Sequence, residues 1–161
     1  MKKKIYYLTL STKFPSTHIK AGQPTEFEDA FNAGQEFSRK KVFCKYRKLH
    51  TIRANYEFWA KRFEKIKTGE ACLSVREWVG KPYGKGSTQR EIALLTREDG
   101  IGIQKLRFDK SRRLPNVDYK PVGVGRLAYN DGLSLEDWKE WFKDYDLSKP
   151  MTIIHFTSFR Y

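Results

Sequence analysis

Runs with the pattern of β-strands recur along the whole chain, and helical patterns separate them at only three places. The strand-like runs are residues 5–10, 71–78, 91–96, 101–108 and 151–159. Strands and helices do not alternate as they do in βαβ folds, so a doubly wound parallel sheet is excluded. The order predicts an α+β domain built round a small, mostly antiparallel β-barrel that is flanked by about three helices.

Each of the three helical segments begins with a residue that can cap a helix. Thr25 with Glu28 and Ser134 with Asp137 have capping-box spacing, and Asn55 precedes the second segment. The apolar residues at helical spacing are Phe27, Ala30, Phe31 and Gly34, then Tyr56, Trp59, Phe63 and Ile66, then Leu135, Trp138, Phe142 and Tyr145. We expect these side chains to face the core, and we expect the second helix to stop at Gly69.

The length and the aromatic content predict one folded domain over residues 1–161. A chain of 161 residues with 15% aromatic side chains has enough apolar surface for a single core. The apolar run that follows the lysines at 2–4 is too short for a signal segment or a membrane span. Cys44 and Cys72 form neither a disulfide framework nor a zinc motif, so we expect a cytoplasmic protein without a membrane partner.

The charge is large and unevenly distributed. Lys and Arg number 32 against 19 Asp and Glu, which gives a formal net charge of +13. Residues 37–56 contain no acid but carry Arg39, Lys40, Lys41, Lys45, Arg47, Lys48 and Arg53 among aromatic side chains, whereas residues 131–146 are acidic. Nucleic acid is therefore the first partner class to consider. A solvated basic surface and a surface that binds an acidic protein both remain open alternatives.

Three patterns that suggest cofactor or metal sites do not fit their structural context. Residues 123–128 match a dinucleotide fingerprint, but the residues that follow predict a turn. Residues 80–87 have the composition of a phosphate loop without its glycine spacing, which indicates a flexible basic loop. His18, His50 and His155 are scattered, so we expect neither a metal site nor a cofactor.

The most specific local pattern is Lys48-Leu49-His50-Thr51-Ile52-Arg53, which lies just before the second helix. This K-x-x-T-I-R run resembles the signature of the ASCH family, a branch of the PUA-like superfamily with a small β-barrel flanked by helices. Residues 123–135 resemble the strand, acidic turn and capped helix of such domains, and residues 74–83 resemble the strand and loop that border their cleft. The resemblance covers roughly residues 42–159, with residues 1–41 as a family-variable part.

The resemblance implies a catalytic set of Lys48, Thr51 and Asp131. In the similar bacterial 4-acetylcytidine amidohydrolases, a lysine, a threonine three residues later and a downstream carboxylate act together. Thr51 would attack the acyl carbonyl, Lys48 would act as a base or as a fixed cation, and Asp131 would move a proton. Those enzymes have glutamate where this chain has Asp131, which is one methylene shorter. Composition alone would make Thr51 an ordinary strand residue.

The expected function is a module that binds nucleic acid or a nucleotide and recognises RNA or a modified base in a basic cleft. DNA is a further candidate partner, and the amidohydrolase is the alternative function. Trp78 is either a wall of the cleft that stacks a base or a part of the core. The residues predicted to contact the ligand are Lys45, Arg47, Arg53, Arg76, Trp78, Lys81 and Tyr83.

Overall fold

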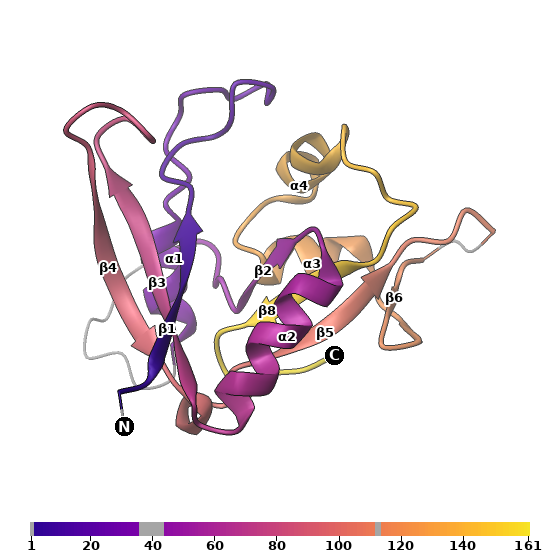
Figure 1. The fold of residues 1–161 in the computed structure, drawn as a ribbon. Helices are drawn as coiled ribbons and strands as arrows, with labels where there is room; N and C mark the ends of the chain where they lie inside the picture. Colours follow the sequence, from indigo (N-terminus) through magenta and orange to yellow (C-terminus); the bar gives the residue numbers. More distant parts are fainter. Residues whose placement is uncertain (1, 36–43, 112–113) are drawn as a thin grey trace.

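The structure is a computed structural model that describes residues 2–35, 44–111 and 114–161 (Figure 1). The strands in these residues are β1 (Lys4–Leu10), β2 (His50–Arg53), β3 (Ala71–Val79), β4 (Thr88–Leu95), β5 (Gly102–Arg107), β6 (Asn116–Val117), β7 (Lys120–Pro121) and β8 (Met151–His155). The helices are α1 (Phe27–Gly34), α2 (Tyr56–Lys67), α3 (Val124–Asn130) and α4 (Leu135–Phe142), and η1 (Arg97–Asp99) is a 3₁₀ turn. This set of helices and strands confirms the predicted α+β class.

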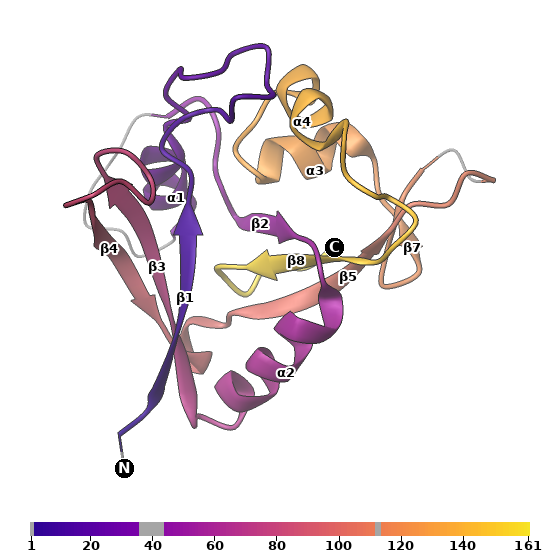
Figure 2. The same cartoon turned by 45° about the horizontal axis from the view of Figure 1, so that its top comes forward.

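The strands form two open sheets. One sheet has the order β1-β3-β4, in which β1 and β3 run parallel and β3 and β4 antiparallel. The other has the order β2-β8-β5-β6-β7 and is antiparallel throughout. Figure 2 shows the five-stranded sheet between α2 on one side and α3 and α4 on the other. Leu10 at the end of β1, Arg53 at the end of β2 and Trp141 of α4 line one cavity.

Neither sheet closes into a barrel in the described residues, in contrast to the predicted architecture. The ladder breaks between β4 and β5, where η1 and Gly100 turn the chain out of the first sheet. Gly100 has φ +76°, and a Cβ there would lie 2.9 Å from the Cβ of Ser158. Such a turn needs glycine, and the strand that leaves it pairs with β8 and β6 instead of continuing beside β4.

Two of the three predicted helix starts are confirmed. Asn55 accepts a hydrogen bond from the backbone N–H of Phe58 at the start of α2, and Ser134 accepts one from Asp137 at the start of α4. The prediction of a capping box at Thr25 is wrong, because Glu26 and not Thr25 holds the N-cap position of α1. The Thr25 hydroxyl donates to the carbonyl of Ser11 at 2.6 Å and accepts from the N–H of Phe27 at 3.4 Å. The residue before α1 is Glu26, which has a left-handed backbone with φ 59°.

The segment predicted as a strand and an acidic turn contains helix α3. Gly123 precedes it without a side-chain cap, and Leu127 and Ala128 are fully buried. Tertiary packing therefore stabilises a helix that local sequence signals do not favour. The last strand is also shorter than predicted, since β8 ends at His155.

The core joins both sheets to the helices that flank them. Its fully buried apolar residues include Leu73, Val75, Leu106, Val117, Leu127, Ile153, Ile154 and Phe156. The α2 prediction is confirmed for Trp59, Phe63 and Ile66, whereas Leu135 and Tyr145 are 36% and 43% exposed and do not belong to the core. Both cysteines are free thiols. Among the residues described, no helix has the length and apolar character needed to cross a bilayer.

Candidate functional site

A cavity of about 330 Å³ lies where the end of β1, the start of α1, strand β2 and the α3–α4 region meet. We call it the inner cavity. Its polar lining includes Lys48, Thr51, Arg53 and Asp131, and its apolar lining includes Phe27, Trp141, Phe142 and Tyr145. Four of the residues predicted as site residues, from segments about eighty positions apart, therefore border one space.

Lys48 and Asp131 form a buried ion pair in this cavity. The Lys48 ammonium donates to the Asp131 carboxylate at 2.8 Å and to the Asp131 backbone carbonyl at 2.6 Å. The ammonium also lies 3.9 Å from the centre of the Phe27 ring. Burial lowers the pKa of Lys48 and raises the pKa of Asp131, and the attraction between the two charges opposes both shifts. Proton transfer between the two groups is therefore easier than in water.

The backbone brings these two residues together as well. Lys48 and Asp131 form an isolated antiparallel bridge just before β2 begins, and the N–H of Leu49 donates to the carbonyl of Asn130 at 2.8 Å. Gly132 follows with φ +82°, and a Cβ there would lie 3.3 Å from the Cβ of Lys48. The close approach of the two backbone segments thus depends on the glycine that follows Asp131.

Thr51 shares the cavity with Lys48 because the regular strand starts between them. In a straight strand, residues three apart point to opposite faces. Here β2 begins only at His50, so Lys48 lies outside the regular ladder and both side chains line the same space. Thr51 is 6% exposed.

Arg53 connects the inner cavity to a larger groove of about 1250 Å³. We call it the outer groove; it lies between the end of β1 and the β3–β4 loop, and its lining includes Lys13, Arg53, Trp78, Lys81 and Tyr83. The Arg53 guanidinium donates to the carbonyl of Thr9 at 2.7 Å. Its buried Nε has no hydrogen-bond partner among the described residues. A donor is therefore left without a partner where the two spaces meet.

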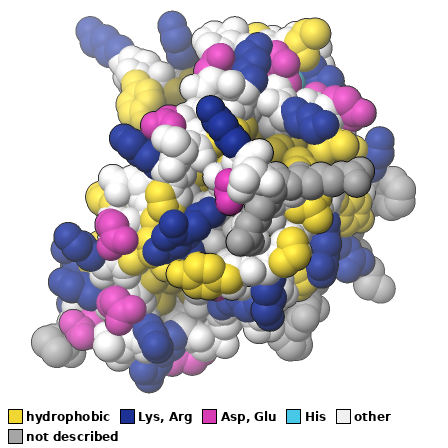
Figure 3. Space-filling view, turned by 90° about the vertical axis from the view of Figure 1, so that its right-hand side faces the viewer, with side chains coloured by type: hydrophobic (Ala, Val, Ile, Leu, Met, Phe, Trp, Pro, Cys, Tyr) yellow, Lys and Arg dark blue, Asp and Glu magenta, His cyan; other side chains and the backbone are white. Residues whose placement is uncertain are grey.

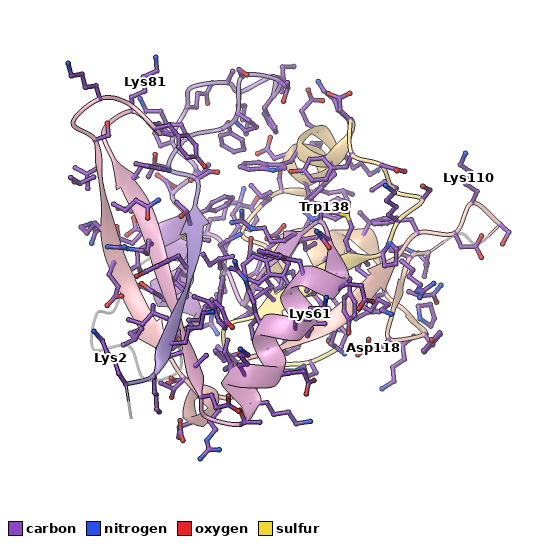
Figure 4. The ribbon with its side chains drawn as sticks, in the orientation of Figure 1. Lys2, Lys61, Lys81, Lys110, Asp118 and Trp138 are labelled. Atoms are coloured by element: carbon purple, nitrogen blue, oxygen red, sulfur yellow. The ribbon has the colours of Figure 1, made fainter. Side chains whose placement is uncertain are left out.

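The end of β3 and the loop after it contribute an aromatic pair, Trp78 and Tyr83, to the outer groove. The rings of Trp78 and Tyr83 lie 4.9 Å apart at an angle of 55°, and Tyr83 is 89% exposed. Lys81 lies at the tip of this loop (Figure 4). Trp78 is half-buried and borders the groove.

Three predicted ligand-binding residues lie elsewhere. Arg76 borders neither space; its guanidinium lies 5.3 Å from the centre of the Tyr7 ring and donates to the carbonyl of Gln89. Lys45 lies over the Tyr46 ring and lines a different, smaller cavity, and Arg47 is exposed outside both spaces. The basic residues Arg39, Lys40 and Lys41 lie outside the described residues.

A buried hydrogen-bonded network adjoins the ion pair. His50 Nε2 lies 2.7 Å from the Tyr161 hydroxyl, which also accepts from Asn130 at 3.0 Å. His50 Nδ1 lies 4.0 Å from the Asp131 carboxylate. Burial, with the charges of His155 and Lys48, lowers the pKa of His50 well below its usual value, so this imidazole is neutral at pH 7.

The aromatic walls of the inner cavity were not identified as site residues from the sequence. Phe27 and Phe142 follow helical spacing and were expected in the core, Trp141 lies one position outside that pattern, and Tyr145 was assigned to a buried helix face. Apolar periodicity does not distinguish a core position from a cavity wall. The Lys48 ammonium over its ring distinguishes Phe27 from an ordinary core residue, but the sequence alone does not reveal this contact.

No cluster of three or more metal-binding side chains occurs among the described residues. Comparison of the chain with protein-family models, with curated proteins and with solved structures finds no match. The functional argument therefore depends on the geometry of the inner cavity and the outer groove.

Proposed function

We propose that this protein binds a nucleotide unit of RNA, with the base in the inner cavity and the phosphate backbone along the outer groove. The observation that carries this proposal is the convergence of Lys48, Thr51, Arg53 and Asp131 on one aromatic-walled cavity. The proposal includes a relationship to ASCH-type PUA-like domains, suggested by the K-x-x-T-I-R motif at residues 48–53.

The size and lining of the inner cavity suit a flat polar ring. A volume of about 330 Å³ lies at the lower end of the range of small-ligand sites. The aromatic side chains offer faces on which a base stacks. A carboxylate has about four acceptor positions, so Asp131 can accept from a base amine while it also pairs with Lys48. The Thr51 hydroxyl adds a donor and an acceptor.

The outer groove suits the phosphate backbone that is attached to such a base. Its charged lining residues are Lys13, Arg53 and Lys81, all of them cations. Trp78 and Tyr83 lie beside them and provide stacking faces. A basic groove with adjacent aromatics is the usual arrangement for single strands.

The test is the binding of a fluorescein-labelled 12-nucleotide single-stranded RNA, measured by anisotropy at several salt concentrations. We expect Kd to rise steeply with salt. Lys81→Glu is expected to weaken binding and to reduce the slope of log Kd against log salt by about 1. Lys61→Glu is the matched control, because it changes the net charge equally on α2, outside both spaces (Figure 4).

Two outcomes would contradict binding in this groove. The first is the absence of salt-dependent binding by the unchanged protein. The second is an equal loss of affinity in the Lys61→Glu and Lys81→Glu proteins, since it would show that only the net charge attracts RNA.

A second candidate function, hydrolysis of an acyl group from the exocyclic amine of a cytidine, is favoured by Thr51 lining the same cavity as the Lys48–Asp131 pair. Thr51 Oγ bonds to the acyl carbon as its proton passes to the uncharged Lys48 amine. The C–N bond then breaks, and the cytidine nitrogen takes that proton. Water hydrolyses the threonine ester, which releases the carboxylic acid and restores the hydroxyl. The lowered pKa of Lys48 favours the uncharged amine that the first step needs.

Incubation with N4-acetylcytidine, followed by chromatography, tests this second function. We expect turnover by the unchanged protein and by Thr51→Ser, which keeps a hydroxyl. Thr51→Val, which has nearly the same shape without the hydroxyl, is expected to lose turnover. Activity that survives Thr51→Val would exclude Thr51 as the nucleophile, and no turnover by the unchanged protein would leave the cavity with binding alone.

A further inference from the structure

Two exposed tyrosines occupy turn positions at which the backbone favours glycine. Tyr83 is 89% exposed with φ 57°, and Tyr119 is 84% exposed with φ 69°. A positive φ is an outlier for a bulky residue, because its Cβ crowds the following carbonyl. Each tyrosine therefore carries a conformational cost without the compensation of burial.

The hydrogen bonds of each turn show which residue type it favours. The N–H of Gly84 donates to the carbonyl of Lys81 at 3.0 Å, so Pro82 and Tyr83 are the central residues of a β-turn. With proline first and a positive φ second, this is the type II pattern, in which glycine is preferred at the second position. Asp118 and Tyr119 form the two-residue connection between β6 and β7, and both have positive φ. A hairpin of this kind favours Asp-Gly.

Hydrogen bonds from β5 fix the turn that carries Tyr119. The Asp118 carboxylate accepts from the backbone N–H of Lys105 at 2.9 Å and from the Gln104 amide at 3.2 Å. These bonds attach the turn to β5. Tyr119 is therefore held outward by a fixed support, as Tyr83 is held beside Trp78.

The two tyrosines lie on opposite sides of the inner cavity. Tyr83 borders the outer groove, which shares Arg53 with the inner cavity. Tyr119 borders a third space of about 990 Å³, which shares Tyr145 with the inner cavity and which we call the side groove. Lys81 and Lys110, one from each flanking groove, lie on loops at opposite sides of the molecule (Figure 4).

The side groove is lined by three basic and two acidic side chains. Its charged lining residues are Arg107, Lys110, Lys149, Asp109 and Asp146. The two carboxylates accept hydrogen bonds from nearby serines, Asp109 from Ser111 at 2.7 Å and Asp146 from Ser148 at 2.5 Å. Basic side chains also alternate with hydrophobic ones, with some acids among them, over the face in Figure 3. This composition complements a phosphate backbone with bases that stack.

We propose that Tyr83 and Tyr119 are stacking platforms for bases on either side of the nucleotide held in the inner cavity, so that the ligand is a single-stranded polynucleotide that crosses the protein from the outer groove to the side groove. This inference rests on the proposed function and extends it from one nucleotide to several. Stacking on an exposed ring explains why tyrosine stands where the turn favours glycine.

The test measures binding and thermal stability of Tyr83→Gly and Tyr119→Gly, with a 12-nucleotide RNA, its deoxyribose counterpart and cytidine monophosphate as ligands. Each substitution is expected to weaken RNA binding about tenfold, the usual order for one stacked base. Binding of the monophosphate is expected to stay unchanged. The melting temperature of the Tyr119→Gly protein is expected not to fall, because the Asp-Gly dipeptide suits the hairpin. Comparing the RNA with its deoxyribose counterpart shows whether binding across the two grooves requires the 2′-hydroxyl.

A Tyr119→Gly protein that binds the 12-mer as tightly as the unchanged protein would overturn the inference, as would equal affinity for the monophosphate and the 12-mer. In either case the proposed function would stand if the monophosphate bound. Failure of all three ligands to bind would instead reject the proposed function itself. A marked fall in the melting temperature of the Tyr119→Gly protein would show that the tyrosine is structural and would also overturn the inference.

Discussion

Replacing Lys48 with methionine is expected to lower the free energy of unfolding by about 3–5 kcal/mol, because it leaves the Asp131 carboxyl buried without its cation. Burial raises the pKa of Asp131, and the Lys48 charge opposes that rise. Without Lys48 the carboxyl must take up a proton or remain unpaired. Urea unfolding at pH 7 measures the change.

The controls for this experiment separate the pair from a general effect of removing a lysine. Lys45→Met removes an exposed cation three residues earlier and is expected to cost less than about 0.5 kcal/mol. Asp131→Asn added to Lys48→Met is expected to recover part of the lost stability, because no unpaired charge remains to be buried. Equal unfolding free energies for the Lys45→Met and Lys48→Met proteins would show that the ion pair does not hold the site together.

Acidification below pH 6.5 is expected to destabilise the protein through two buried histidines, His50 and His155. Burial and the charges around it keep the pKa of His50 well below 6.5, and burial with the Arg160 charge lowers the pKa of His155 to about 3. In the unfolded chain both imidazoles take up protons near pH 6.5. The stability that they contribute is therefore complete above pH 6.5 and is lost as pH falls from there toward 3.

The linkage slope gives the size of this effect. A histidine that is protonated only in the unfolded state costs about 1.4 kcal/mol per pH unit below pH 6.5, so His155 alone lowers the unfolding free energy by about 2 kcal/mol between pH 7.5 and pH 5. The lowered pKa of His50 adds to this loss in the same direction. Urea unfolding at several pH values measures it. His155→Gln, which keeps an amide to bond with Gln104, is expected to remove the contribution of His155 and so to reduce the slope of unfolding free energy against pH. An unfolding free energy that is flat between these pH values would contradict the neutral, buried histidines.

Local signals predicted the elements whose stabilising contacts are themselves local. The side chains of Asn55 and Ser134 cap their own helices, and the apolar spacing of Trp59, Phe63 and Ile66 matches the buried face of α2. Such contacts lie within four residues along the chain, so the sequence alone contains them.

Predictions failed where a distant partner decides the conformation. The Thr25 hydroxyl donates to the distant carbonyl of Ser11, and Glu26 takes the N-cap position that was predicted for Thr25. Helix α3 exists because Leu127 and Ala128 are buried against the rest of the fold. The expected barrel did not form, because η1 and Gly100 separate the ladders of β4 and β5. No local pattern contains these long-range contacts.

The candidate site shows the same division. The pairing of Lys48 with Asp131 spans 83 positions and was suggested only by resemblance to a family motif. The aromatic walls of the inner cavity were indistinguishable from core residues. The exposed tyrosines at positive φ could be recognised only from backbone angles, because Pro-Tyr-Gly and Asp-Tyr-Lys are unremarkable as sequences.

Photo-crosslinking tests most directly whether a base occupies the inner cavity. A 12-nucleotide RNA with one central 4-thiouridine is bound to the protein and irradiated, and mass spectrometry locates the adducts. We predict adducts on residues that wall the inner cavity, namely Thr51 to Ala54, Trp141, Phe142 and Tyr145. Adducts that form only elsewhere, for example on the exposed side of α2, although the RNA binds, would contradict the account.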